Sequence, residues 1–121
     1  MKILHLLTAG GLGGIEILNY DFGLYSKHEQ GFAFLFGLGT TYERMLNSGY
    51  VVYDLSEYQP KICKERKKKL LEIGQKYDII AVHHGDPYLK YYYCYVINIL
   101  KSKGIAFIHS CWDETLFFKI I

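Results

Sequence analysis

The chain alternates short, almost wholly apolar runs with longer segments in which apolar residues recur at helical spacing. We predict that the apolar runs are strands and that the segments between them are helices. The predicted strands cover residues 2–7, 32–36, 50–54, 79–83 and 106–109. Helices are predicted from residue 15 onward, near 42–47, from 60 to about 76, and over 88–103. In the first helix the spacing gathers Ile15, Leu18, Phe22 and Tyr25 on one face and leaves Asn19 off it.

Apolar strands separated by helices are typical of a parallel sheet that is covered on both faces. We therefore expect an α/β protein with a Rossmann-like, doubly wound parallel sheet of about five strands, in a three-layer α/β/α arrangement. The length of 121 residues fits a single domain over 1–121, and it is too short for two domains with separate cores. Ligands of such sheets bind outside the carboxyl ends of the strands, which here are the loops after Leu7, His83 and His109.

Composition narrows the class of protein. Half of the residues are hydrophobic, which excludes a disordered chain, and the net charge of +2 gives no field typical of a nucleic-acid binder. The three cysteines share no CxxC spacing and fit reduced thiols. The first apolar run is too short for a secretory signal, and no window approaches the roughly 20 apolar residues of a membrane span. We expect a cytoplasmic protein whose membrane contact, if any, is peripheral and on the inner face.

Four glycines occupy residues 10–14, between the first predicted strand and the first predicted helix. Glycine leaves no Cβ in the path of a ligand, and amides at a helix N-terminus suit a phosphate or another anion. The pattern is neither a P-loop nor a clean GxGxxG, and no acidic residue near Phe36 could hold a ribose. A tight turn that packs strand on helix is the alternative. Four glycines exceed what a turn needs, so the sequence favours a ligand that approaches the backbone.

Histidines follow the next two strands of the predicted sheet: His83 and His84 after the fourth, and His109 at the end of the fifth. Imidazoles at strand ends can hydrogen-bond sugar hydroxyls or phosphate oxygens. Together with Asp86 they could also ligate a metal, but their spacing matches no metal motif, and we predict none. The alternative is structural, with Asp86 capping the next helix and the histidines bonded to backbone groups. Cys111 lies near His109 without a third group to orient such a pair.

These features resemble a known family. Residues 1–6 followed by 10–16 are similar to the opening of GT-B glycosyltransferases of the family 4 type, with a strand, a GG-x-GG-like loop and a helix that starts GGxE. His83-His84-Gly85 and His109 stand where that family carries histidines after its fourth and fifth strands, although Ser110 replaces the usual Gly or Asp. The resemblance implies a loop near the donor diphosphate and acceptor, in a cleft between two Rossmann-like domains.

The resemblance also implies roles for residues. His109 is the expected catalytic residue, contacting a sugar hydroxyl or the developing charge on the leaving group. The expected substrate- or phosphate-binding residues are Gly11, Gly13, Gly14, Glu16, His83 and His84. Such enzymes move a sugar from a nucleotide-sugar donor to a saccharide or lipid-linked acceptor, as in the biosynthesis of cell-surface polysaccharides. They usually retain the anomeric configuration, and they need no obligatory metal and no cofactor beyond the donor substrate.

The family's C-terminal domain, which carries an E-x7-E-like motif and most nucleotide contacts, has no counterpart in this sequence. The chain is therefore expected to be a shortened acceptor-side domain, inactive without a C-terminal domain or partner subunit. A non-catalytic α/β module that docks on a partner through apolar surface, such as the tyrosine-rich helix 88–103, is the alternative function. A flavodoxin- or receiver-like domain is disfavoured, because His5 and Thr8 stand where an acidic cluster would be expected.

Six of the 14 basic residues fall within nine positions, between Lys61 and Lys69. A solvated helix face is the simplest explanation, and contact with anionic lipid headgroups is the functional one. Arg66 falls among the apolar positions, where we expect its side chain to reach out to the edge. Nucleic acid is not an expected partner, because no aromatic residues are interleaved with the lysines.

Overall fold

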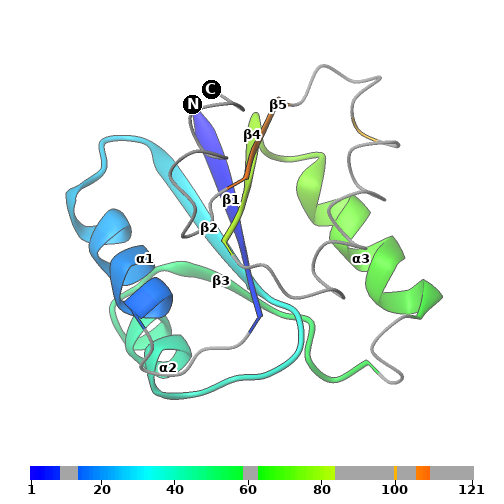
Figure 1. The fold of residues 1–121 in the computed structure, drawn as a ribbon, viewed down its shortest axis with the longest axis horizontal. Coiled ribbons are helices and arrows are strands. Elements are labelled where there is room, and N and C mark those ends of the chain that lie inside the picture. Colours follow the sequence, from blue (N-terminus) through cyan, green and yellow to red (C-terminus); the bar gives the residue numbers. More distant parts are fainter. Residues whose placement is uncertain (9–13, 59–62, 84–99, 101–105, 110–121) are drawn as a thin grey trace.

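The computed structural model describes residues 1–8, 14–58, 63–83, 100 and 106–109, and for 14–16 and 106–109 it describes the backbone (Figure 1). Three helices and the strands of one sheet alternate along these residues. In order, they are β1 (Lys2–Leu7), α1 (Gly14–Tyr25), β2 (Glu29–Phe34), α2 (Thr40–Asn47), β3 (Val51–Asp54), α3 (Lys64–Gly74), β4 (Ile79–Val82) and β5 (Ala106–His109). Of the predicted helix 88–103, only Leu100 is described, and its side chain is fully buried.

All strand pairs are parallel, in the order β3-β2-β1-β4-β5. The predicted α/β class with a parallel sheet is confirmed, and the strand order is compatible with a Rossmann-like fold. Strands β1 to β4 carry described side chains, whereas β5 is placed by its backbone pairing with β4. The direction in which strands are added reverses between β1 and β4.

Helices cover both faces of the sheet (Figure 1). One core cluster packs strand residues such as Leu4 and Ile80 against Leu70 and Ile73 of α3. On the other face Phe32 and its strand neighbours pack against Met45 of α2. Alternate residues of β1 therefore belong to different cores: Leu4 and Leu6 face α3, and Leu7 faces α1 and α2. This alternation explains why the strands are apolar throughout.

The observed β2 begins earlier than the predicted strand, at Glu29 instead of residue 32. Parallel pairing with β1 accounts for the difference, because Glu29 and Gln30 pair in register with Lys2 and Ile3. Backbone pairing of this kind does not depend on an apolar side chain, so polar residues can form the start of a strand. The local hydrophobic pattern therefore understates the length of this strand.

Arg66 does not reach out to the edge as the sequence predicted, and its side chain is only 1% exposed. Its Nε donates a hydrogen bond of 2.8 Å to the carbonyl of Leu55, and its Nη2 donates to the carbonyl of Tyr58. The guanidinium also lies over the Phe36 ring, 5.2 Å from its centroid. These backbone carbonyls follow β3 and need donors, and the buried arginine supplies them.

Helix α1 differs from its sequence pattern in the face that it buries. Its apolar residues Leu18, Phe22 and Tyr25 are 52%, 43% and 81% exposed, whereas Asn19 is fully buried. The helix approaches the rest of the protein through Gly23, where a Cβ would come within 2.4 Å of the Tyr50 ring. Gly23 lies one turn after Asn19, so the helix packs closely on its glycine side, while Leu18 and Tyr25 face outward and Phe22 is half-exposed.

Candidate functional site

Parallel pairing brings the carboxyl ends of β1, β4 and β5 to one edge of the sheet, the carboxyl edge. Leu6 pairs with Val82, and Val82 pairs with His109. These strands therefore end side by side, and His83 directly follows β4 there. The strand order reverses at this place, and doubly wound sheets bind their ligands at such a reversal.

The structure places some of the predicted site residues through their backbone. Gly14 is the first residue of α1, and Glu16 lies in the first turn of that helix. His109 is the last residue of β5, as the sequence predicted. Gly11, Gly13 and His84 lie outside the described residues. Of the predicted set, His83 is the residue whose side chain the structure describes.

His83 directly follows β4, and its side chain is 5% exposed. Its backbone N–H donates to the carbonyl of Leu6 at 3.3 Å, which extends the pairing of β4 with β1. Its Nε2 lies 2.6 Å from Nδ1 of His5. The two ring planes differ by 23°, and their centroids are 4.9 Å apart. The rings therefore meet edge to edge, as a hydrogen bond between ring nitrogens requires.

His5 sits within β1, opposite Phe32 of β2 and Ala81 of β4. Its ring lies parallel to that of Phe32, with centroids 4.9 Å apart, and Phe22 of α1 covers it at 5.9 Å. On the side away from His83, its Nε2 lies 2.6 Å from Oε1 of Gln30. Gln30 in turn donates from Nε2 to the carbonyl of Phe22, at 3.2 Å. Gln30, His5 and His83 thus form a line of hydrogen bonds across three strands, which we call the histidine relay.

Burial keeps both imidazoles of the relay neutral. It lowers the pKa of His5 to about 4, although the hydrogen bond with Gln30 acts in the opposite direction. Burial also lowers the pKa of His83 to about 3, and the proximity of His5 adds to the effect. The carboxyl edge at β1 and β4 therefore presents uncharged rings at neutral pH.

Thr8 ends this side of β1, just before the predicted glycine loop. Its Oγ1 is buried and has no hydrogen-bond partner in the part of the chain that the structure describes. A hydroxyl in that position can donate to or accept from a ligand at the same edge. Within the described ranges, no three His, Cys, Asp or Glu side chains gather to hold a metal ion.

The sequence predicted His83 but missed its two partners. His5 interrupts the apolar run of residues 3–7, and that interruption is the signal that could have identified it. Gln30 precedes the predicted strand 32–36, so the pattern gave no face on which to place it. The relay depends on the register of three strands, because His5 and His83 are 78 residues apart in the sequence.

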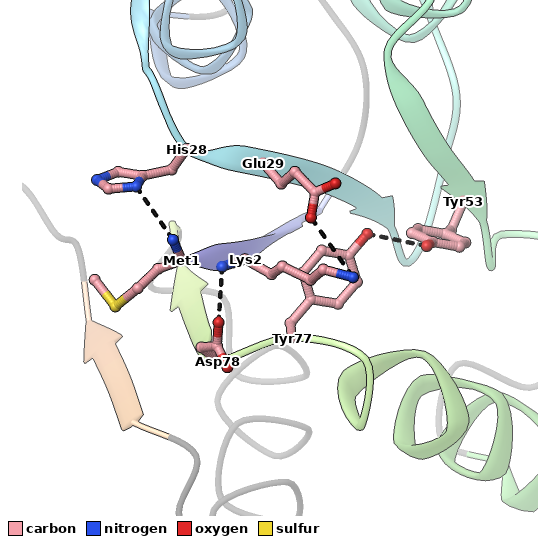
Figure 2. A network of polar contacts seen from close by, with 7 residues as sticks. All are labelled: Met1, Lys2, His28, Glu29, Tyr53, Tyr77 and Asp78. Atoms are coloured by element: carbon pink, nitrogen blue, oxygen red, sulfur yellow. Dashed lines mark hydrogen bonds and ion pairs between the residues drawn. The ribbon is translucent and has the colours of Figure 1, made fainter.

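The opposite, amino edge of the sheet carries charges (Figure 2). Lys2 forms an ion pair with Glu29 at 3.5 Å, and its backbone N–H donates to Asp78 at 2.9 Å. Beside them, the hydroxyls of Tyr53 and Tyr77 are 3.0 Å apart. Burial and the Tyr53 hydroxyl raise the pKa of Tyr77 well above its usual value. These contacts join the starts of β1, β2 and β4.

Comparison with known proteins adds no assignment to this geometry. No family model, no curated protein and no solved structure matches the chain.

Proposed function

We propose that the protein is the acceptor-side domain of a GT-B glycosyltransferase resembling family 4. It would take part in moving a sugar from a nucleotide-sugar donor to a saccharide or lipid-linked acceptor. The strand order is the observation that most supports this proposal. It brings the ends of β1, β4 and β5, and with them His83 and His109, to one edge of the sheet. That edge is where a Rossmann-like domain binds its ligand.

Each predicted residue has a role in this proposal. The backbone amides of Gly13 and Gly14, at the start of α1, contact the donor phosphate or the acceptor, and Gly11 allows their approach. His109 contacts a sugar hydroxyl or the charge that develops on the leaving group. His83, His84 and Glu16 support the same ligand. The nucleotide sugar is a substrate, and the reaction needs neither a metal nor a further cofactor.

A C-terminal domain or partner subunit would supply the remaining donor contacts, so the chain alone would bind ligand without transferring sugar. The test combines the chain with a candidate C-terminal GT-B domain and measures sugar transfer from UDP-glucose. A Gly13→Val variant should lose turnover by at least about 100-fold, because a branched side chain blocks the approach to the backbone. Its thermal melting should match that of the unmodified chain. Normal turnover by Gly13→Val would refute the role of the loop.

His109 can be tested in the same assay with a matched histidine control. His109→Ala should reduce transfer by about 100-fold or more, because it removes a group placed at the reacting sugar. His28→Ala should leave transfer unchanged, because His28 is an exposed residue that precedes β2 at the amino edge. Equal activity of the two variants would remove His109 from the proposed site.

A second candidate function is a non-catalytic module that docks on a partner. The exposed apolar side of α1 favours it, because Leu18, Phe22 and Tyr25 line a surface hollow of about 440 Å³. Size-exclusion mass measurement and a UDP-glucose titration separate the two functions. A stable monomer without affinity for the nucleotide sugar, even beside a C-terminal domain, would favour the module.

Peripheral contact with anionic lipid through residues 61–69 is part of the first proposal and would place the protein at the inner face of the membrane. The exposure of Lys64, Lys68 and Lys69 on α3 supports it. No helix in the described part of the chain is long and apolar enough to cross a membrane. Binding to anionic vesicles should exceed binding to neutral vesicles, and equal weak binding would exclude a lipid role for these lysines.

A further inference from the structure

We propose that His83 presents an unprotonated Nδ1 to the hydroxyl group of a ligand, and that His5 and Gln30 are positioning residues that fix this state. The inference deepens the proposed function, on which it rests only for identifying the hydroxyl as that of a sugar. The geometry of the relay carries the argument: it runs from Gln30 near the start of β2, through His5 within β1, to His83 at the carboxyl edge.

The direction of the relay is set at its far end, by the carbonyl of Phe22. A carbonyl oxygen can only accept, so the group of Gln30 that contacts it at 3.2 Å must be the amide Nε2. The other atom of that amide, Oε1, is therefore the one that faces His5 at 2.6 Å. Because Oε1 can only accept, the proton of this hydrogen bond belongs to Nε2 of His5.

The same reasoning continues from His5 to His83. A neutral imidazole carries one ring proton, so a proton on Nε2 of His5 leaves its Nδ1 as an acceptor. That Nδ1 lies 2.6 Å from Nε2 of His83, which must then donate. His83 consequently holds its own proton on Nε2, and its Nδ1 is left with a free lone pair.

The ring of His5 is held in one orientation. Both of its nitrogens have a partner at 2.6 Å, so turning the ring over would place carbon atoms against Gln30 and His83. Phe32 and Phe22 also pack along its faces. The relay therefore transmits the orientation of the Gln30 amide to His83, because the reversed ring would lose both hydrogen bonds.

The unprotonated Nδ1 of His83 favours a hydroxyl group over a phosphate oxygen as its partner. Nδ1 makes no hydrogen bond within the described part of the chain, although the residue is only 5% exposed. A lone pair there accepts from a hydroxyl and repels the acceptor oxygens of a phosphate. His83 is thus suited to the uncharged, hydroxyl-bearing part of a ligand.

The first arm of the test reads the proton positions directly. Long-range ¹H–¹⁵N spectra of the full 121-residue chain at pH 7 should show His5 and His83 both protonated at Nε2 and bare at Nδ1. A proton on Nδ1 of His83 would overturn the inference.

Gln30→Leu should scramble the proton positions of both histidines, because His5 loses the acceptor that fixes its tautomer. Gln30→Glu should restore a proton at Nε2 of His5, because a carboxylate oxygen also accepts. Gln75→Leu, the same change at an exposed position after α3, should alter neither ring. If Gln30→Leu leaves both tautomers fixed, or if Gln75→Leu disturbs them equally, Gln30 is not a positioning residue. If Gln30→Leu fails to fold, Gln30→Glu and the unmodified chain decide the question.

The second arm tests the ligand class, with glucose and inorganic phosphate as probes. Glucose should shift the Nδ1 resonance of His83 and leave the exposed His28 unmoved, whereas phosphate should not shift His83. A larger response of His83 to phosphate, or no response to glucose, would overturn the assignment of a hydroxyl site. Failure of sugar transfer in the completed enzyme would refute the proposed function and leave the tautomers and the glucose response intact, so the two failures are distinguishable.

Discussion

The ion pair at the amino edge and the histidine pair of the relay differ in how far water reaches them, although the same sheet holds both. At the amino edge, the side chains of Lys2 and Glu29 are 56% and 73% exposed, and water solvates both charges. His83 at the carboxyl edge and its partner His5, within β1, are by contrast each 5% exposed and neutral. Lys2 and Glu29 can bind water when their ion pair breaks, whereas the buried nitrogens that join His5 and His83 need each other as hydrogen-bond partners. A polar group held in one state is what a binding site requires, and His83 is such a group at the carboxyl edge.

The largest expected effect comes from removing the centre of the relay. His5→Ala leaves a cavity between Phe22 and Phe32 and deprives His83 of its acceptor, so we expect a loss of about 4 kcal/mol in the free energy of unfolding. His28→Ala, an exposed histidine at the other edge, should change it by no more than about 0.5 kcal/mol. Urea denaturation of both variants measures the difference. Similar losses would mean that the two edges do not differ as described.

The pH dependence of stability provides a second contrast. Because His5 and His83 have pKa values of about 4 and 3 when folded and near 6.5 when unfolded, the unfolded chain binds protons first as the pH falls. Their contribution is complete above pH 6.5 and is lost as the pH drops toward those folded values. At pH 5 the loss should reach about 2 kcal/mol per histidine.

Urea denaturation at a series of pH values measures this loss, with two variants as references. His5→Phe should flatten the decline between pH 6.5 and 5, because one of the buried titrating groups is gone. His28→Ala should keep the decline. An unchanged slope in His5→Phe would show that the buried pair does not control acid stability.

A smaller effect is expected from close packing at the amino edge. A Cβ at Gly31 would lie 2.1 Å from the hydroxyl oxygen of Tyr77, so Gly31→Ala forces the two apart. We expect a loss of about 2 kcal/mol in the free energy of unfolding. Adding Tyr77→Phe should recover part of it, since that change removes the nearest atom. Additive losses in the double variant would rule out this contact as the cause.

The smallest effect should follow from breaking the exposed ion pair. Glu29→Gln removes the charge that faces Lys2, and we expect a loss of no more than about 0.5 kcal/mol, weaker still in high salt. Urea denaturation at low and high salt checks it. A loss as large as that of His5→Ala would contradict the contrast between the edges.

Part of this structure could be predicted from the sequence and part could not, for physical reasons. The bounds of β1 and β5 follow from local apolar runs, and the parallel sheet follows from their alternation with helices. The start of β2 at Glu29 could not be found locally, because its pairing with Lys2 fixes it. Arg66 was placed on the correct helix, but its burial depends on carbonyls of Leu55 and Tyr58 that the helical pattern does not contain.

The candidate site, too, could be predicted from the sequence only in part. His83 is visible as a polar residue after an apolar strand, and His5 could have been noticed as a polar residue within one. Their contact and the orientation of Gln30 arise only when β2, β1 and β4 lie in register. Local sequence can suggest which side chains are available, whereas the protonation state of each is a property of the assembled sheet.

The most direct test of the account is to map where the ¹⁵N-labelled chain binds UDP-glucose. If the carboxyl edge is the ligand edge, the resonances that shift will be those of His83, Gly14 and His109, and those of Lys2, Glu29 and Asp78 will stay in place. Shifts confined to the amino edge, or no shifts beside a candidate C-terminal domain, would contradict it.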